Sequence, residues 1–264
     1  MDTAILGLEK LLWALTLSLL FGSMLWLVSV RKENVAFVDV GWPIIFWFAA
    51  VLFFQANTEP RSVAWVGLAM ISLWALRLTL HVLVRNAGRP EDRRYREIRE
   101  KFNPGFKWKS LFVIFWFQAV LACALAAPLY VISSSHKTIE PLHLAAIALW
   151  MVGMAFEAIA DQQLFRFHRR TNHANGVLTT GLWRYTRHPN YFGEFCIAWG
   201  FFVFSLPSGG WWTVFAPLAL TYFLLRFSGV ARMEAGMEKR RPGYREYTSR
   251  TNAFFPGRPR ESKS

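Results

Sequence analysis

The chain has 264 residues, 54% of them hydrophobic, and a formal net charge of +13. Apolar runs long enough to cross a hydrocarbon layer of ~30 Å recur along it, which excludes an ordinary soluble protein of one or two domains. The positive charge lies in the polar gaps between these runs, and no zinc-finger, recognition-helix or RNA-binding motif accompanies it, so we do not expect a nucleic-acid partner.

Seven apolar runs predict membrane-spanning helices. In chain order they cover about residues 11–30, 35–55, 63–84, 110–132, 142–164, 190–206 and 211–230. The sequence therefore predicts an all-α integral membrane protein, with residues 1–264 forming a single domain built as a bundle of about seven transmembrane helices. Polar loops at about 85–109 and 165–189 and a polar tail at about 231–264 complete it.

The basic residues predict the orientation of this bundle. Nine Lys and Arg residues lie in 85–109 and nine more in 232–263, whereas the loops near Arg61 and Lys137 carry almost none. With seven spans, all the basic segments fall on one face, which the positive-inside rule assigns to the cytoplasm. We therefore expect the N-terminus outside and the C-terminus in the cytoplasm, with a bacterial inner membrane as the location. The start of the chain lacks the basic region of a signal peptide, so the first span should be retained.

Ionisable groups inside or near the spans need a partner, a polar cavity or a function. They are Asp39, Arg77, His81, Glu157, Asp161, Glu194, Arg226 and Glu234. Buried ion pairs that join helices are one interpretation, and a polar site open to the cytoplasm is the other.

Three polar clusters could bind an anion. In residues 181–194, Arg187 and His188 precede Pro189, which suits the first turn of a helix, and a helix start attracts phosphate. Residues 85–92 and 240–250 add further arginines, which suit bidentate phosphate contacts. The competing interpretation is a set of basic loops that face anionic lipid headgroups.

Several site types are excluded by the sequence. There is no glycine-rich dinucleotide motif after a strand, no P-loop and no serine nucleophile elbow. The histidines lack metal-ligand spacing, so no metal is expected.

Four stretches together resemble the steroid 5α-reductase family in its broad bacterial branch. They are residues 37–43 (Phe-Val-Asp-Val-Gly-Trp-Pro), 86–92 (Asn-Ala-Gly-Arg-Pro-Glu-Asp), 181–194, and 241–244 with 254–256. The resemblance implies a seven-span enzyme that passes a hydride from NADPH to the β-carbon of an enone, best known in 3-oxo-Δ4-steroids, which it converts to 5α-reduced products. The substrate would be a lipid-soluble molecule that enters from the bilayer.

The resemblance also implies site residues. Those implied to bind NADPH, on a face formed by the two polar loops and the tail, are Asn86, Arg89, Asp161, Arg166, Arg169, Arg187, His188, Asn190, Tyr191, Glu194, Arg226 and Glu234. An acidic residue and a tyrosine polarise the carbonyl in that family, and Asp39 matches the acid, whose buried carboxyl could stay protonated and donate a hydrogen bond.

The tyrosine of that pair has no counterpart near residue 74. Trp74, Arg77, His81 and a tyrosine from another segment remain open as the second catalytic group. An alternative function is an S-adenosylmethionine-dependent membrane methyltransferase of the isoprenylcysteine or phospholipid type, which also carries the Arg-His-Pro-x-Tyr element. A transporter or scaffold is a third, but no inverted repeat supports it.

Overall fold

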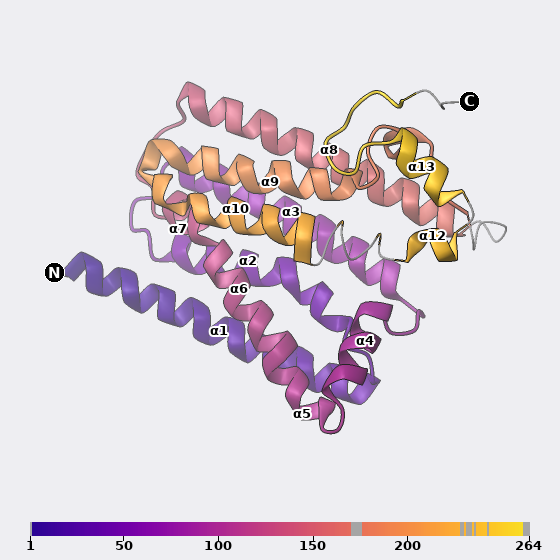
Figure 1. Ribbon diagram of the computed structural model, residues 1–264. Helices are drawn as coiled ribbons and strands as arrows, with labels where there is room; N and C mark the ends of the chain where they lie inside the picture. The colour runs from indigo at the N-terminus through magenta and orange to yellow at the C-terminus, as the bar shows by residue number, and fades with distance from the viewer. Residues whose placement is uncertain are drawn as a thin grey trace. The chain divides into compact units, whose positions relative to one another are not determined.

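The structure is a computed structural model that describes residues 2–169, 176–227, 230, 234, 236–241 and 243–260, and the side chains of these residues apart from 2–8, 227 and 239. All regular secondary structure within these ranges is helical (Figure 1). The chain divides into two compact units, residues 1–139 with 208–210 and residues 140–207 with 211–264. The prediction of one membrane-embedded domain stays a prediction.

Five described helices are long and apolar enough to cross a membrane, which makes this a multi-pass integral membrane protein. They are Glu9–Lys32, Phe37–Gln55, Ser62–Asn86, Phe106–Leu125 and Pro141–Arg169, and they confirm the first five predicted spans. Large apolar side chains remain uncovered on them: Leu20, Leu76 and Leu144 are each about 60% exposed. Lipid rather than water is the solvent that suits such a surface.

The predicted sixth and seventh spans are helical but shorter. Helix α9, Pro189–Ser205, has 17 residues and a length of about 26 Å, slightly below the thickness of the hydrocarbon core. The last apolar run is divided into a 3-10 turn, the α-helix α10 at Phe215–Tyr222 and a π-helical turn at Phe223–Phe227. The number of seven spans and the orientation therefore stay predictions.

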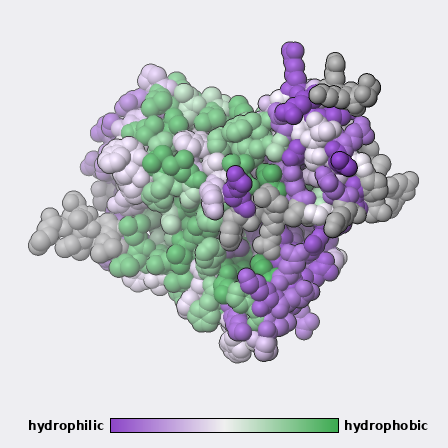
Figure 2. Space-filling view, viewed as in Figure 1, coloured by the Kyte–Doolittle hydropathy of each residue, from purple (hydrophilic) through white to green (hydrophobic). Residues whose placement is uncertain are grey.

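The first unit is built around α2, Phe37–Gln55. This helix contacts α1 (Asp2–Lys32), α3 (Ser62–Asn86), α6 (Phe117–Leu125) and α7 (Ala127–Ser133). Half of its apolar window is buried, the largest share among the five spans. On the drawn face, hydrophobic residues cover α1 and hydrophilic residues cover α4 (Figure 2).

Two short helices lie in the polar loop that follows α3. Helix α4, Arg93–Phe102, begins where the Asp92 carboxylate accepts a hydrogen bond from the Arg94 backbone N–H at 2.9 Å, an N-cap that satisfies one free amide. Helix α5, Phe106–Ser110, continues through a π-helical turn into α6. The loop predicted between the third and fourth spans is therefore largely helical.

The second unit is built on the pair α8, Pro141–Arg169, and α9. Glycines allow their backbones to approach: a Cβ at Gly153 would lie 2.6 Å from the Gly193 carbonyl oxygen, and one at Gly193 would lie 2.6 Å from the Glu157 backbone nitrogen. Small residues at such contacts are typical of helix packing in membranes. Helices α12, Met237–Arg240, and α13, Tyr244–Arg250, follow in the tail, where hydrophilic residues gather (Figure 2).

This packing makes a testable prediction. Gly153→Ala should destabilise the protein by about 1–3 kcal/mol, because the new methyl group meets backbone that cannot rotate away. Thermal unfolding in detergent should show a Tm lower by several degrees. Ala155→Leu, a larger change at an exposed position of the same helix, is the control and should leave the Tm near that of the wild type. Equal Tm values for Gly153→Ala and the wild type would contradict the close packing.

Candidate functional site

The carboxylate of Asp39, in the first turn of α2, is the centre of a polar cluster in the first unit. Its Oδ1 accepts a hydrogen bond from the hydroxyl of Tyr95 on α4. Its Oδ2 lies 3.4 Å from Nη2 of Arg94 and 3.6 Å from Nη2 of Arg85, at the end of α3. The cluster therefore joins residues 37–43 to the helix that follows residues 86–92.

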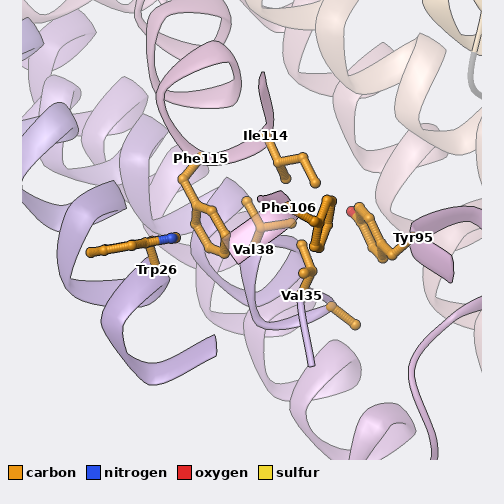
Figure 3. Close-up of a cluster of buried hydrophobic side chains, with 8 residues drawn as sticks. Trp26, Val35, Val38, Tyr95, Phe106, Ile114 and Phe115 are labelled. Atoms are coloured by element: carbon orange, nitrogen blue, oxygen red, sulfur yellow. The ribbon is translucent and has the colours of Figure 1, made fainter. Parts of the chain in front are cut away.

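The side chain of Tyr95 is fixed by apolar packing and by a hydrogen bond. Its side chain is 6% exposed and lies in an apolar cluster with Trp26, Val35, Phe106 and other residues, where its ring is beside that of Phe106 (Figure 3). Its hydroxyl group donates to the Asp39 carboxylate. Burial, together with the neighbouring Asp39, raises the pKa of Tyr95 well above its ordinary value, so the hydroxyl is a hydrogen-bond donor at neutral pH.

The pairing of Asp39 differs from the sequence-based expectation. A protonated carboxyl in an apolar site was expected, but two guanidinium groups face the Asp39 carboxyl. Their positive charges complement a carboxylate, so the geometry assigns the acceptor role to Asp39 and the donor role to Tyr95. Although burial lowers the pKa of the Arg94 guanidinium, the charges of Asp39 and Asp92 outweigh this and raise it, so Arg94 stays cationic.

The loop at 86–92 has mainly structural contacts. Glu91 accepts hydrogen bonds from the Val35 backbone N–H at 2.8 Å and from Arg99 Nη2 and Nε at 2.8 and 3.0 Å. Asn86 accepts a bond of 3.1 Å from Arg85 Nε. By contrast, the Arg89 side chain is exposed and forms no ion pair with any residue that the structure describes. Arg89 is thus the arginine of this loop that is available to a ligand.

The other candidate catalytic residues lie on α3. Trp74 is 5% exposed and contacts the Phe46 ring edge-to-face, at 5.6 Å between centroids. Its indole Nε1 is buried and has no hydrogen-bond acceptor in the described part of the chain. Arg77 and His81 are half-buried on the same helix. These three residues lie on the same helix as Arg85, whose guanidinium reaches the Asp39 carboxylate.

In the second unit, Arg187 and His188 converge on Glu234. Arg187 donates from Nε and Nη2 to the two carboxylate oxygens, at 2.7 and 2.9 Å, and His188 Nε2 lies 3.0 Å from Oε1. Arg187 Nη1 also donates to the carbonyls of Thr251 and Thr248, at 2.8 and 3.2 Å. This guanidinium is therefore already engaged by the protein itself.

The tail closes over residues 181–188. Thr186 Oγ1 donates to the Phe254 carbonyl at 2.7 Å, and the Arg187 backbone N–H donates to the Asn252 carbonyl at 2.9 Å. The hydroxyl of Tyr247 donates to the carbonyl of Trp183. The stretch at 181–188 and the tail at 247–254, distant in sequence, thus belong to one packed substructure.

An acceptor-rich group lies at the start of α9. Asn190 donates from Nδ2 to Oδ1 of the buried Asp161 at 3.3 Å, while its own Oδ1 is buried without a donor among the described residues. The ring of Tyr191 stacks on His188, with 5.4 Å between centroids. An uncompensated acceptor of this kind suits a ligand hydroxyl or amide N–H.

The remaining candidate residues are more open. Arg166 and Arg169 are exposed in the last turns of α8, Arg169 with its guanidinium 5.4 Å from the centre of the Phe165 ring. Arg226 is exposed in the π-helical turn after α10, and Glu194 is half-buried on α9. Tyr95 and Arg94 were not identified from the sequence. The sequence did contain a signal for Tyr95. Ile98 and Phe102 follow it at helical spacing, which predicts an amphipathic helix in this basic stretch with Tyr95 on its apolar face.

Glu234 makes the stability of this unit depend on pH. Burial raises its pKa, but the hydrogen bonds from His188 and Arg187 lower it more, to about 2 from an ordinary value of 4.5. A carboxylate with a depressed pKa contributes stability that is present above pH 4.5 and is lost as the pH falls towards 2. The Tm of the wild type should therefore fall between pH 4.5 and 2, and Glu234→Gln should have a lower Tm at pH 7 and a smaller fall in this range.

Glu246→Gln is the matched control, because the Glu246–Arg250 pair is exposed and such pairs contribute little. It should follow the wild-type curve. A Glu234→Gln curve with the same fall as the wild type would show that Glu234 is not the group that titrates.

Comparisons with known proteins identify the family. Residues 25–251 match the family described as "Protein of unknown function (DUF1295)", and the chain belongs to this family. An uncharacterized protein of Schizosaccharomyces pombe is 30% identical over 275 residues, which cover 92% of this chain and 78% of the relative. No solved structure matches the chain.

Proposed function

We propose that this DUF1295 membrane protein is an NADPH-dependent reductase that saturates the carbon–carbon double bond of an enone lipid, with a 3-oxo-Δ4-steroid as substrate and its 5α-reduced form as product. The observation that carries the proposal is the hydrogen bond between Tyr95 and Asp39. The steroid 5α-reductase resemblance implies an acid–tyrosine pair at the substrate carbonyl, and this pair supplies both members. The relation of DUF1295 to the steroid 5α-reductase-like superfamily also supports the proposal.

The chemistry assigns distinct tasks to these side chains. Reduction of an enone places developing negative charge on the carbonyl oxygen, so a donor must face that oxygen in a site shielded from water. The Tyr95 hydroxyl can turn from Asp39 to the carbonyl oxygen by rotation about its C–O bond. Arg94 and Arg85 stay beside the Asp39 carboxylate and balance its charge. A proton then reaches the α-carbon, which completes the addition of two hydrogens.

The proposed cofactor residues fit NADPH in chemical type. Bound NADPH would supply the hydride that the β-carbon receives. Arg89, Arg166, Arg169 and Arg226 are exposed cations suited to phosphate groups. Asn190 Oδ1 and Asp161 are acceptors suited to ribose hydroxyls or a carboxamide. Arg187, His188 and Glu234 would have a structural role in the site and would not bind the cofactor directly, because their polar atoms are bound to one another.

The proposal includes the membrane arrangement. The chain would have seven spans, with the N-terminus outside and the basic loops and tail in the cytoplasm, where NADPH is available. A lipid-soluble substrate would enter from the bilayer, in keeping with the uncovered apolar surface of the spans. Phosphates would meet the exposed arginines on the cytoplasmic face.

A ligand-binding measurement separates this proposal from methyl transfer. NADPH at about 100 times its Kd should stabilise the purified protein by ~2.7 kcal/mol and raise its Tm, whereas S-adenosylmethionine should not. Arg89→Ala should weaken NADPH binding at least tenfold, because a charge-assisted hydrogen bond contributes about 1.5–3 kcal/mol.

Arg93→Ala is the control for this measurement, since Arg93 is equally basic but is paired with Glu97 at 2.7 Å on the surface of α4. It should bind NADPH as the wild type does. A rise in Tm with S-adenosylmethionine but not with NADPH would contradict the proposed reductase activity and support the methyltransferase.

Tyr95→Phe tests the polarising group. The ring that packs against Phe106 is retained and the hydroxyl is lost, so kcat for enone reduction should fall about 10²–10³-fold, as when one oxyanion donor is removed. The rise in Tm with NADPH should persist, which distinguishes a chemical defect from a folding defect. Tyr130→Phe, which removes a hydroxyl from α7 in the same unit, is the control. A Tyr95→Phe protein with normal kcat would exclude Tyr95 as the donor.

A further inference from the structure

Trp74 is one of several residues of the first unit with a buried polar atom that has no hydrogen-bond partner in the described part of the chain. The indole Nε1 of Trp74 is enclosed and unpaired within the described part of the chain. Other indoles of this unit have acceptors: Trp26 donates to the Lys107 carbonyl at 2.8 Å, and Trp47 donates to the Ser72 hydroxyl at 3.0 Å. A buried N–H without an acceptor is destabilising, so its presence points to an acceptor that arrives with a ligand.

Trp74 lies deeper along the same helix pair as the Asp39 cluster. Its ring contacts Phe46, which is seven residues after Asp39 on α2 and therefore about 10 Å further along the helix axis. On α3, Trp74 precedes Arg85 by eleven residues, a spacing that returns to the same helix face, and Arg85 reaches the Asp39 carboxylate. The Asp39 carboxylate therefore lies at one end of the α2–α3 pair, and the Trp74 N–H lies further along it.

We propose that Trp74 Nε1 donates a hydrogen bond to an oxygen at the far end of the substrate, while the enone carbonyl lies at Tyr95 and Asp39. This inference rests on the proposed function and narrows its substrate class. The spacing of Asp39 and Phe46 along α2, on the order of 10 Å, exceeds a single ring and is similar to the length of a fused, rigid four-ring skeleton. The substrate would thus be a steroid that bears an oxygen at the end opposite its enone, rather than one that ends in a hydrocarbon chain.

The role given to Trp74 is one of specificity. An N–H in an apolar site rejects a ligand that lacks the acceptor, because the donor is then left buried and unpaired. The oxygen need only accept, so a ketone or a hydroxyl would serve equally. Trp74 binds the substrate at the end remote from the double bond and would act through KM rather than through kcat.

The test compares two matched steroids, androst-4-ene-3,17-dione and androst-4-en-3-one, which lacks the far oxygen. For the wild type, kcat/KM should favour the dione about tenfold, which corresponds to ~1.4 kcal/mol, with most of the difference in KM. Trp74→Phe should reduce this preference to about one. Trp65→Phe, at a 57% exposed position of the same helix, should keep the wild-type preference.

Direct binding separates failure of this inference from failure of the proposed function. Equilibrium dialysis of both steroids against the purified protein, without NADPH, should show the same tenfold preference and its loss in Trp74→Phe. Equal affinities in the wild type, or an unchanged preference in Trp74→Phe, would overturn the role of Trp74 even if the enone is reduced. Absence of reduction with the binding preference intact would overturn the reductase and leave the Trp74 site standing.

Discussion

The carboxylate of Asp39 imposes the constraint on which the first unit depends. A charge at the start of an apolar span is costly unless it is paired and hydrogen-bonded. The polar loop after α3 meets this requirement by folding α4 against α2, so that Tyr95 and Arg94 both reach the carboxylate. Asp92 begins α4 and also binds Arg94, and the Arg94 interaction keeps the pKa of Asp92 low although burial raises it. One carboxylate thus organises a loop that would otherwise be solvated.

The basic segments of this chain contain two kinds of arginine. Arg94, Arg99 and Arg187 are engaged by carboxylates of the same unit and hold the fold together. Arg89 and Arg226 are exposed and can meet a phosphate or a lipid headgroup. Net charge alone does not separate these groups, because both contribute equally to it and to the positive-inside pattern. The Arg-His-Pro element belongs to the first kind, because Arg187 binds Glu234 and the Thr251 carbonyl and so stabilises the contact between loop and tail.

The two proposed ligand contacts in the first unit differ in how they are satisfied. Tyr95 already has a partner in Asp39, so its hydroxyl is oriented before any substrate arrives. Trp74 has none among the described residues, so its N–H gains most when a ligand supplies an acceptor. A hydroxyl that is already oriented suits Tyr95, which would stabilise negative charge during the reaction. An N–H without an acceptor suits Trp74, which would select the substrate.

Membrane spans were largely determined by the sequence, because hydropathy is a local sum over about twenty residues and needs no knowledge of neighbours. Five predicted spans are confirmed, and Asp39 was placed correctly near the start of the second. The partners of Asp39 were decided by the tertiary structure alone. Tyr95 is 56 residues away in sequence, and no local pattern states which hydroxyl will fold back onto which carboxylate. The same holds for the engagement of Arg187 by Glu234 and for the isolation of the Trp74 N–H, since each depends on what the surrounding helices bring near.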